Sequence, residues 1–230
     1  MSLEASAMGS APMSRDEILP VALLLAFVGG YLDTYTWITH GILANAQTAN
    51  LVFLWVHATA GRWQQAFHFV PPLFAFFVGV VIAAWLRQAV GDKAGQISLL
   101  VEIGMLILVG ILHNHMPEVA GTLGISMVAA MQSSIFTRVE GSVYSSVMIT
   151  GNFRQAIEGT FLLTLGSGQA GLLRKSCIFM GVCAAFGTGA ATGAFLTERM
   201  PAYTLIVPVA ALVLVVLLCK MSRPIEAGQS

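Results

Sequence analysis

The stretch Gln47-Thr48-Ala49-Asn50-Leu51 places two amides and a hydroxyl in the middle of a long uncharged run. No Asp, Glu, Lys or Arg occurs between Thr34 and Gly61. Polar groups at lipid depth are costly unless they meet partners, so they are expected to line protein or water rather than face acyl chains. The stretch therefore predicts a polar centre inside a membrane protein.

Composition supports this class. The chain has 230 residues, of which 57% are hydrophobic and 10% charged, and its mean hydropathy is +0.80. A soluble domain would carry roughly 25% charged residues. The 11 basic and 11 acidic residues balance, so we expect no nucleic-acid partner. The three cysteines lack a CxxC spacing, so neither disulfides nor a metal site is expected.

We predict an all-α fold, a polytopic membrane bundle of about seven or eight transmembrane or half-membrane segments. The predicted segments cover residues 18–39, 44–59, 65–86, 97–112, 119–137, 143–165, 172–197 and 202–219. A full span needs about 20 residues, so the short segment 44–59 is either tilted or re-entrant. We expect a flexible segment over residues 1–17, a single membrane domain over 18–223 and a tail over 224–230.

An internal repeat is predicted from identities at a fixed offset. Thr48 and Thr150 lie 102 residues apart, as do Asn50 and Asn152. The same offset relates Phe77, Gly79, Val80 and Ala83 to Phe179, Gly181, Val182 and Ala185. The alternative is chance in a chain rich in Ala, Val and Gly. The repeat halves would cover about residues 18–117 and 118–223, each with a helix interrupted at its Thr-x-Asn motif. Four spans per half would make the halves parallel and three would invert them; we expect four.

Small residues at every fourth position mark two predicted helices. Such spacing lets helices approach closely in lipid, where packing drives association. The predicted packing positions are Gly79, Ala83, Gly181, Ala185, Gly189 and Gly193.

Several polar residues are candidates for a substrate or ion pathway. Asp33, Thr36 and His40 share one helix face, and a carboxylate at membrane depth costs about 2.5 to 3.5 kcal/mol on insertion scales. Asp33 is thus a candidate proton or cation site, or else a structural hydrogen-bond acceptor. The full set of candidates is Asp33, His40, Gln47, Thr48, Asn50, Gln132, Thr150, Asn152, Arg154 and Glu158. The alternative for the Thr, Asn and Gln residues is hydrogen bonding that holds helices together.

Several charged and histidine residues also have structural interpretations. Arg154 and Glu158 are one turn apart and can pair, which favours a structural role. Glu102 is interpreted as an interfacial charge. His113 and His115 precede Pro117 in a predicted loop and do not share a helix face, so no metal is expected there.

Basic residues give an orientation. With eight spans, the side of the N-terminus would carry Arg15, Arg62, Arg174, Lys175, Lys220 and Arg223, against Arg87, Lys93, Arg138 and Arg199 opposite. This bias favours a cytoplasmic N-terminus.

Enzyme signatures are missing from the sequence. There is no Gly-rich loop followed by Lys-Ser or Lys-Thr, no GxSxG and no HExxH, so we expect no enzyme and no cofactor. The sequence favours a small-molecule or ion transporter of the membrane, with Asp33 as the candidate for proton coupling. The alternative is a non-transporting scaffold or regulatory protein. Expected partners are lipid, an unidentified small ligand and, given the Gly-rich surface, a second copy of the chain.

Four motifs together resemble the YoaK-like family of bacterial inner-membrane proteins. They are Gly29-Gly30-Tyr31-Leu32-Asp33, the stretch at 47–51, Ala130-Met131-Gln132-Ser133-Ser134 and Thr150-Gly151-Asn152. Ala49 stands where the family more often has Gly, and Ser133 where it often has Asn. The resemblance extends from about Ile18 to Arg223 and implies a multi-pass helical protein of the bacterial cytoplasmic membrane.

Overall fold

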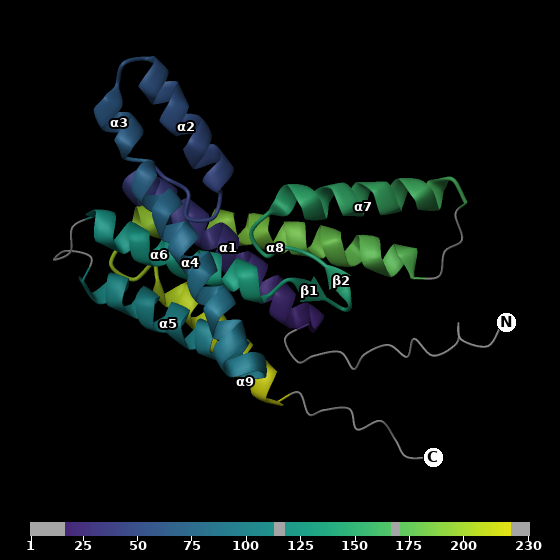
Figure 1. The fold of residues 1–230 in the computed structure, drawn as a ribbon. Coiled ribbons are helices and arrows are strands. Elements are labelled where there is room, and N and C mark those ends of the chain that lie inside the picture. The colour runs from purple at the N-terminus through teal and green to yellow at the C-terminus, as the bar shows by residue number, and fades with distance from the viewer. Residues whose placement is uncertain (1–16, 113–117, 167–170, 222–230) are drawn as a thin grey trace.

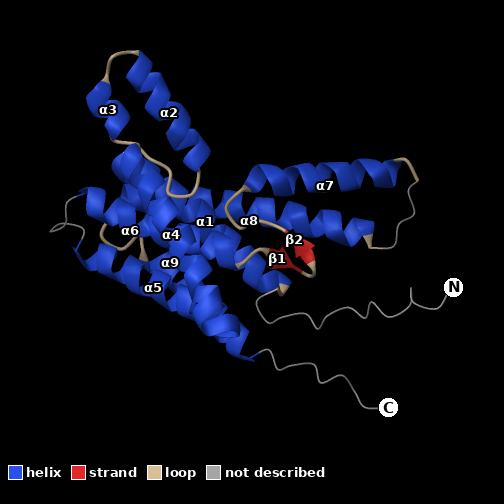
Figure 2. Ribbon diagram, viewed as in Figure 1, coloured by secondary structure: helices blue, strands red, loops and turns tan. Residues whose placement is uncertain are grey.

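The computed structural model describes residues 17–112, 118–166 and 171–221 and is almost entirely helical (Figures 1 and 2). The all-α class is therefore confirmed. Three described stretches, Leu19–His40, Trp63–Leu112 and Leu172–Arg199, are long and apolar enough to cross a membrane. Two further apolar helices, Val119–Ile135 and Ile206–Met221, are shorter. The predicted break at 113–117 lies outside the described residues.

The central helix is α1 (Leu19–His40), which is buried along most of its length. Pro20 fits in its first turn, where a missing N–H costs nothing, and Gly41 ends it at φ 68°, a left-handed conformation that suits glycine. Its 22 residues span about 33 Å at 1.5 Å per residue. This length matches the hydrocarbon core of a bilayer.

Helix α1 makes its most extensive contact with α8 (Leu172–Arg199), from the other end of the chain. A Cβ atom on Gly189 would collide with the backbone of Phe27, and one on Gly193 would meet Tyr31. Both partners advance by four residues, so α1 and α8 run in the same direction. Helix α7 (Ile149–Thr164) lies along the N-terminal part of α8, and the two form a long hairpin (Figure 1).

A second close pair joins α4 (Val70–Val90) to α6 (Glu118–Ile135). A Cβ on Gly79 would strike the backbone of Met127, so the two helices approach closely there. Helices α5 (Ala94–Leu112) and α9 (Ile206–Met221) pack on each other and on these pairs, and the short 3₁₀ helix η1 (Gly91–Lys93) links α4 to α5.

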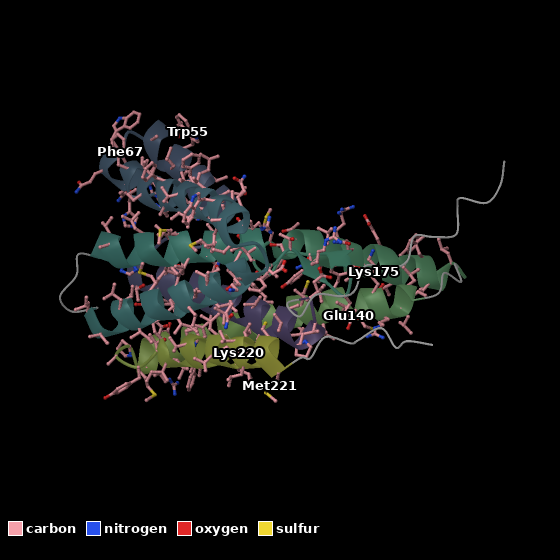
Figure 3. The ribbon with its side chains drawn as sticks, turned by 60° about the horizontal axis from the view of Figure 1, so that its bottom comes forward. Trp55, Phe67, Glu140, Lys175, Lys220 and Met221 are labelled. Carbon is pink, nitrogen blue, oxygen red and sulfur yellow. The ribbon has the colours of Figure 1, made fainter. Side chains whose placement is uncertain are left out.

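A short helical hairpin projects from this body. It consists of α2 (Gln47–Thr59) and α3 (Trp63–Phe67), and Figure 3 shows its side chains Trp55 and Phe67 standing apart from the other helices. Both are exposed, at 59% and 63% of their surface. Contacts between α2 and α4 are few compared with those between α7 and α8.

Some boundaries differ from the sequence expectation. The segment expected over residues 143–165 begins as a helix only at Ile149, because a β-hairpin and a loop precede it. In this hairpin β1 (Arg138–Val139) pairs antiparallel with β2 (Ser142–Val143), through a turn in which Glu140 and Gly141 both have positive φ. The sequence analysis missed these strands. The helix expected at 65–86 is divided into α3 and α4.

Basic residues gather at the end of the bundle where α1 begins. Arg174 pairs with Glu140 at 2.9 Å, and the Glu140 N–H donates to the carbonyl of Glu17. At the ends of α4 and α6, Arg87 donates to the Ile135 carbonyl at 3.1 Å. This grouping differs from the one expected for eight spans, which put Arg87 opposite the N-terminus.

Candidate functional site

A buried amide closes the loop between α1 and α2. Asn50, in the first turn of α2, is fully buried. Its Oδ1 accepts a hydrogen bond from the Leu43 N–H at 3.1 Å, and its Nδ2 donates to the Leu43 carbonyl at 2.7 Å. Nδ2 also donates to Gln47 Oε1 at 3.0 Å. The side chain thus satisfies both backbone groups of one loop residue, which fixes where the helix begins.

The loop before α7 is closed in the same way. The Ser145 N–H donates to Asn152 Oδ1 at 3.3 Å, and Asn152 Nδ2 donates to the Ser145 carbonyl at 2.6 Å. In both loops the partner lies seven residues before the asparagine. Leu43 and Ser145 are also 102 residues apart. Their side chains are unrelated, so sequence identity does not reveal this pair; the groups that bond to the asparagines belong to the backbone.

The first loop folds back along the middle of α1. Asp33 accepts the Asn45 N–H at 2.7 Å, and Thr36 Oγ1 accepts the Ala44 N–H at 3.1 Å. Asn45 Nδ2 donates to the carbonyl of Gly29 at 3.1 Å. Helix α2 therefore begins beside the centre of α1, although α1 itself continues to His40.

Asp33 has a structural role at this point. The N-cap of α2 is Ala46, which offers no side-chain cap, and the Asp33 carboxylate is 7% exposed beside it. A negative charge near a helix N-terminus is favourable because the first N–H groups lack intrahelical partners. The Asp33 carboxylate thus holds the loop directly before the start of α2 and places a negative charge near that helix end, and it also lines the cavity described below.

The second loop is held by α6. Gln132, which is 1% exposed, donates through Nε2 to Ser146 Oγ at 2.9 Å and to the Leu25 carbonyl of α1 at 3.2 Å. Ser145 Oγ accepts the N–H of Met148 at 3.0 Å, directly before α7. A side chain of α6 therefore positions the start of α7, as side chains of α1 position the start of α2.

A cavity of about 1230 Å³ lies where the two loops and helix starts meet. It is lined by residues of α1, α2, α4, α6, α7 and α8 and of both loops. Asp33 is the one charged residue among those lining it within the described part of the chain. The other polar residues that line it are Thr34, Asn45, Gln47, Thr48, Ser133, Ser145, Thr150, Asn152 and Gln155, and its aromatic residues are Trp37, Phe53, Phe76, Tyr144 and Phe186.

This lining suits a small polar solute with an apolar part. Thr48 and Thr150 are exposed in it, one from each helix start. Asn45 Oδ1 is buried without a hydrogen-bond partner among the described residues, so it is a spare acceptor. The N-termini of α2 and α7 add partial positive charge that Asp33 offsets. No lysine or arginine lines the cavity among the described residues.

The other sequence-predicted pathway residues lie elsewhere. His40 contacts Thr39 through its Nδ1 at 2.7 Å and does not line the cavity. Arg154 and Glu158 pair at 3.0 Å with side chains 68% and 56% exposed, also outside the cavity. Asn50 itself is fully buried and is not among the residues that line the cavity.

The predicted packing residues lie at helix contacts. Gly79 faces α6, while Gly189 and Gly193 face α1, as described above. Ala83 is fully buried, and Ala185 packs on a cluster that includes Phe179. A Cβ on Gly181 would make an ordinary contact with Leu23 at 3.5 Å.

The position of Glu102 differs from the sequence expectation. It was interpreted as an interfacial charge, but it is fully buried among protein side chains. It lies on α5 and does not line the large cavity. Among the described residues no group of three potential metal ligands comes together.

Residues 21–218 match a family model described as "Protein of unknown function (DUF1275)". The chain belongs to this family. The match covers the loop before α2, the loop before α7 and the helices that line the cavity. It is consistent with the resemblance to YoaK-like proteins. No curated protein and no solved structure matches the chain.

Proposed function

We propose that this member of the DUF1275 family is a small-solute transporter or permease of the bacterial cytoplasmic membrane, with the large cavity as its solute site. The observation that carries the proposal is that two helix starts, each fixed by an asparagine, meet at one cavity. Discontinuous helices that meet at a repeat interface are a common way to build a solute site at the bilayer midplane.

A repeat of two related halves is supported by more than sequence identities. Helices α2 and α7 begin at Gln47 and Ile149, and α4 and α8 begin at Val70 and Leu172, each pair 102 residues apart. The packing is exchanged between halves, because α1 packs on α8 and α6 packs on α4. Equivalent helices thus make equivalent contacts across the molecule.

An inverted arrangement fits the described helices better than the parallel one expected from the sequence. If α2–α3 and α7 enter the membrane without crossing it, each half keeps three crossing helices: α1, α4 and α5 in the first, and α6, α8 and α9 in the second. An odd number of crossings inverts the second half relative to the first.

The charge distribution agrees with this topology. Six crossings place six of the nine described basic residues on the side where α1 begins and two on the other, while Arg154, within α7, is assigned to neither side. The first group is Arg87, Lys93, Arg138, Arg174, Lys175 and Lys220, and the second is Arg62 and Arg199. The positive-inside rule then supports a cytoplasmic N-terminus more strongly than the grouping for eight spans did.

The two halves differ in a way that suits alternating access. Helix α7 lies along α8, whereas α2 and α3 stand away from α4 (Figure 1). Related halves in unlike conformations can exchange them, and the exchange would open the cavity first to one side and then to the other. Asp33 joins α1 to the start of α2 and lines the cavity, so protonation of its carboxylate would weaken the link to Asn45 and couple protons to this movement.

A scaffold or regulatory role is the second candidate. The side-chain amides of Asn50 and Asn152 both donate hydrogen bonds to loop backbone, which is a structural role. In this alternative the cavity takes no solute.

Solute permeation separates the two candidates. The protein is reconstituted into liposomes, and reswelling after an osmotic step with glycerol, urea or alanine is followed by light scattering. We expect faster reswelling than in protein-free liposomes for at least one solute. Thr150→Trp places a bulky ring in the cavity and should reduce the gain, whereas Thr164→Trp, at an exposed position on α7 outside the cavity, should retain it. Equal rates with and without protein, or equal effects of both variants, would contradict the proposal.

A further inference from the structure

A buried carboxyl lies outside the large cavity. Glu102, near the middle of α5, is 0% exposed. Neither of its carboxylate oxygens has a hydrogen-bond partner among the described residues. This differs from Asp33, whose carboxylate accepts the Asn45 N–H.

No basic side chain of the described residues pairs with Glu102. The described charged residues of the elements packed on α5 are Arg87, Asp92, Lys93 and Lys220 at one end of the bundle, and Glu118, the first residue of α6, at the other. Lys220 and Asp92 share a pocket with Gly95, seven residues before Glu102, or about 10 Å along the helix. Arg87 is bonded to the carbonyls at the end of α6.

Buried apolar residues flank Glu102 on α5, and two buried serines lie on α5 and α6. Leu99 and Leu106, one turn to either side on α5, are buried in the main hydrophobic cluster. Ser98 on α5 and Ser126 on α6 are buried, with hydroxyls that have no partner in the described part of the chain. An isolated carboxylate in such a site loses its hydration without compensation, so the carboxyl is expected to hold a proton instead.

A second pocket lies at one end of α5. This pocket of about 300 Å³ is lined by Asp92, Gln96, Leu99 and Lys220 among others. Leu99 precedes Glu102 by three residues, so it lies one turn nearer the N-terminus of α5, on the same face of the helix. The pocket therefore reaches to within one helical turn of the carboxyl, from the end of the bundle that carries the basic residues.

We propose that Glu102 is an intramembrane proton-binding site, separate from the solute cavity and reached through the pocket at the Asp92–Lys220 end. A role in coupling protons to solute movement rests on the transport function proposed above. Proton binding itself does not, and it is tested on the purified protein without any transport measurement.

Dicyclohexylcarbodiimide is the direct probe. This apolar reagent takes up the proton of a carboxylic acid, the carboxyl oxygen bonds to the reagent's central carbon, and the adduct rearranges to a stable N-acylurea. We expect mass spectrometry of protein in lipid nanodiscs to find the adduct on Glu102, with a yield that falls as pH rises. The exposed Glu158 and Glu198 should remain largely unmodified, and Asp33→Asn should leave the labelling of Glu102 unchanged. A Glu102 that is unlabelled at pH 6, or is labelled equally at every pH, would overturn the proposal.

Thermal stability provides a second readout. A carboxyl that holds its proton in the folded protein but ionises in the unfolded chain makes stability fall as pH rises above the range where an exposed Glu titrates. The wild type should therefore lose melting temperature between pH 6 and pH 9 relative to Glu102→Gln, which keeps the shape without the proton. Coincident pH profiles of the two proteins would contradict proton binding at Glu102. If Glu102→Gln does not fold, the labelling of the wild type decides.

Discussion

Replacing Asn50 by alanine should destabilise the protein far more than replacing its polar neighbour Thr48. Asn50 makes three hydrogen bonds, two of them to the N–H and carbonyl of Leu43. The variant Asn50→Ala leaves both backbone groups without their partner. Leaving a buried polar group unsatisfied costs about 1–3 kcal/mol. Two such groups would cost about 2–6 kcal/mol if they were fully buried. Because Leu43 is only partly buried, we expect the free energy of unfolding to fall by about 2–4 kcal/mol.

Asn152→Ala is the matched variant in the second loop, where two bonds to Ser145 are lost. We expect a loss of similar size. Thr48→Ala and Thr150→Ala are the controls, because both side chains are exposed, and they should change stability by less than about 0.5 kcal/mol. The free energies are measured by SDS titration in mixed micelles with helicity as the signal. The reasoning is refuted if Asn50→Ala falls within about 0.5 kcal/mol of the wild type, or if Thr48→Ala costs as much as Asn50→Ala.

Three other substitutions test separate parts of the account. Gly30→Ala should cost about 3 kcal/mol, because its Cβ would strike the backbone of Phe186, whereas Gly187→Ala on the exposed face of α8 should stabilise by about 0.5 kcal/mol; equal melting temperatures would contradict the close approach. Arg154→Ala should change stability by less than about 0.5 kcal/mol, since its ion pair with Glu158 is solvent-exposed, and a larger loss in thermal denaturation would show that the pair is structural. Asp33→Asn keeps an oxygen that can accept the Asn45 N–H, so it should fold with at most about 1 kcal/mol of lost stability while altering the pH dependence of solute flux; an unchanged flux profile would remove Asp33 from proton coupling.

The sequence predicts the fold class, and it singles out two asparagines that make equivalent contacts in the structure. High hydropathy and few charges predict an all-α membrane protein, and long apolar runs give most helices to within a few residues. The offset of 102 residues singles out Asn50 and Asn152, which turn out to make the same contact. Asparagine at a helix start bonds local backbone, and that chemistry depends little on the neighbouring side chains.

Other features depend on tertiary packing and were not predictable from one chain. The exchanged packing of α1 on α8 and α6 on α4 joins segments far apart in sequence. Glu102 was taken for an interfacial charge because the spacing of a residue from a segment end does not reveal which neighbours cover it. The β-hairpin at residues 138–143 was hidden because a two-residue strand has too few positions to show alternation.

The central claim is that the starts of α2 and α7 face one another across a single cavity. Cross-linking of Thr48→Cys with Thr150→Cys, in a variant whose three native cysteines are replaced by serine, tests it most directly. A flexible bismaleimide applied to protein in native membranes should join the two positions, and should not join Thr48→Cys to Thr164→Cys at the far end of α7. Efficient cross-linking of the control pair, or none of the first pair, would contradict the shared cavity.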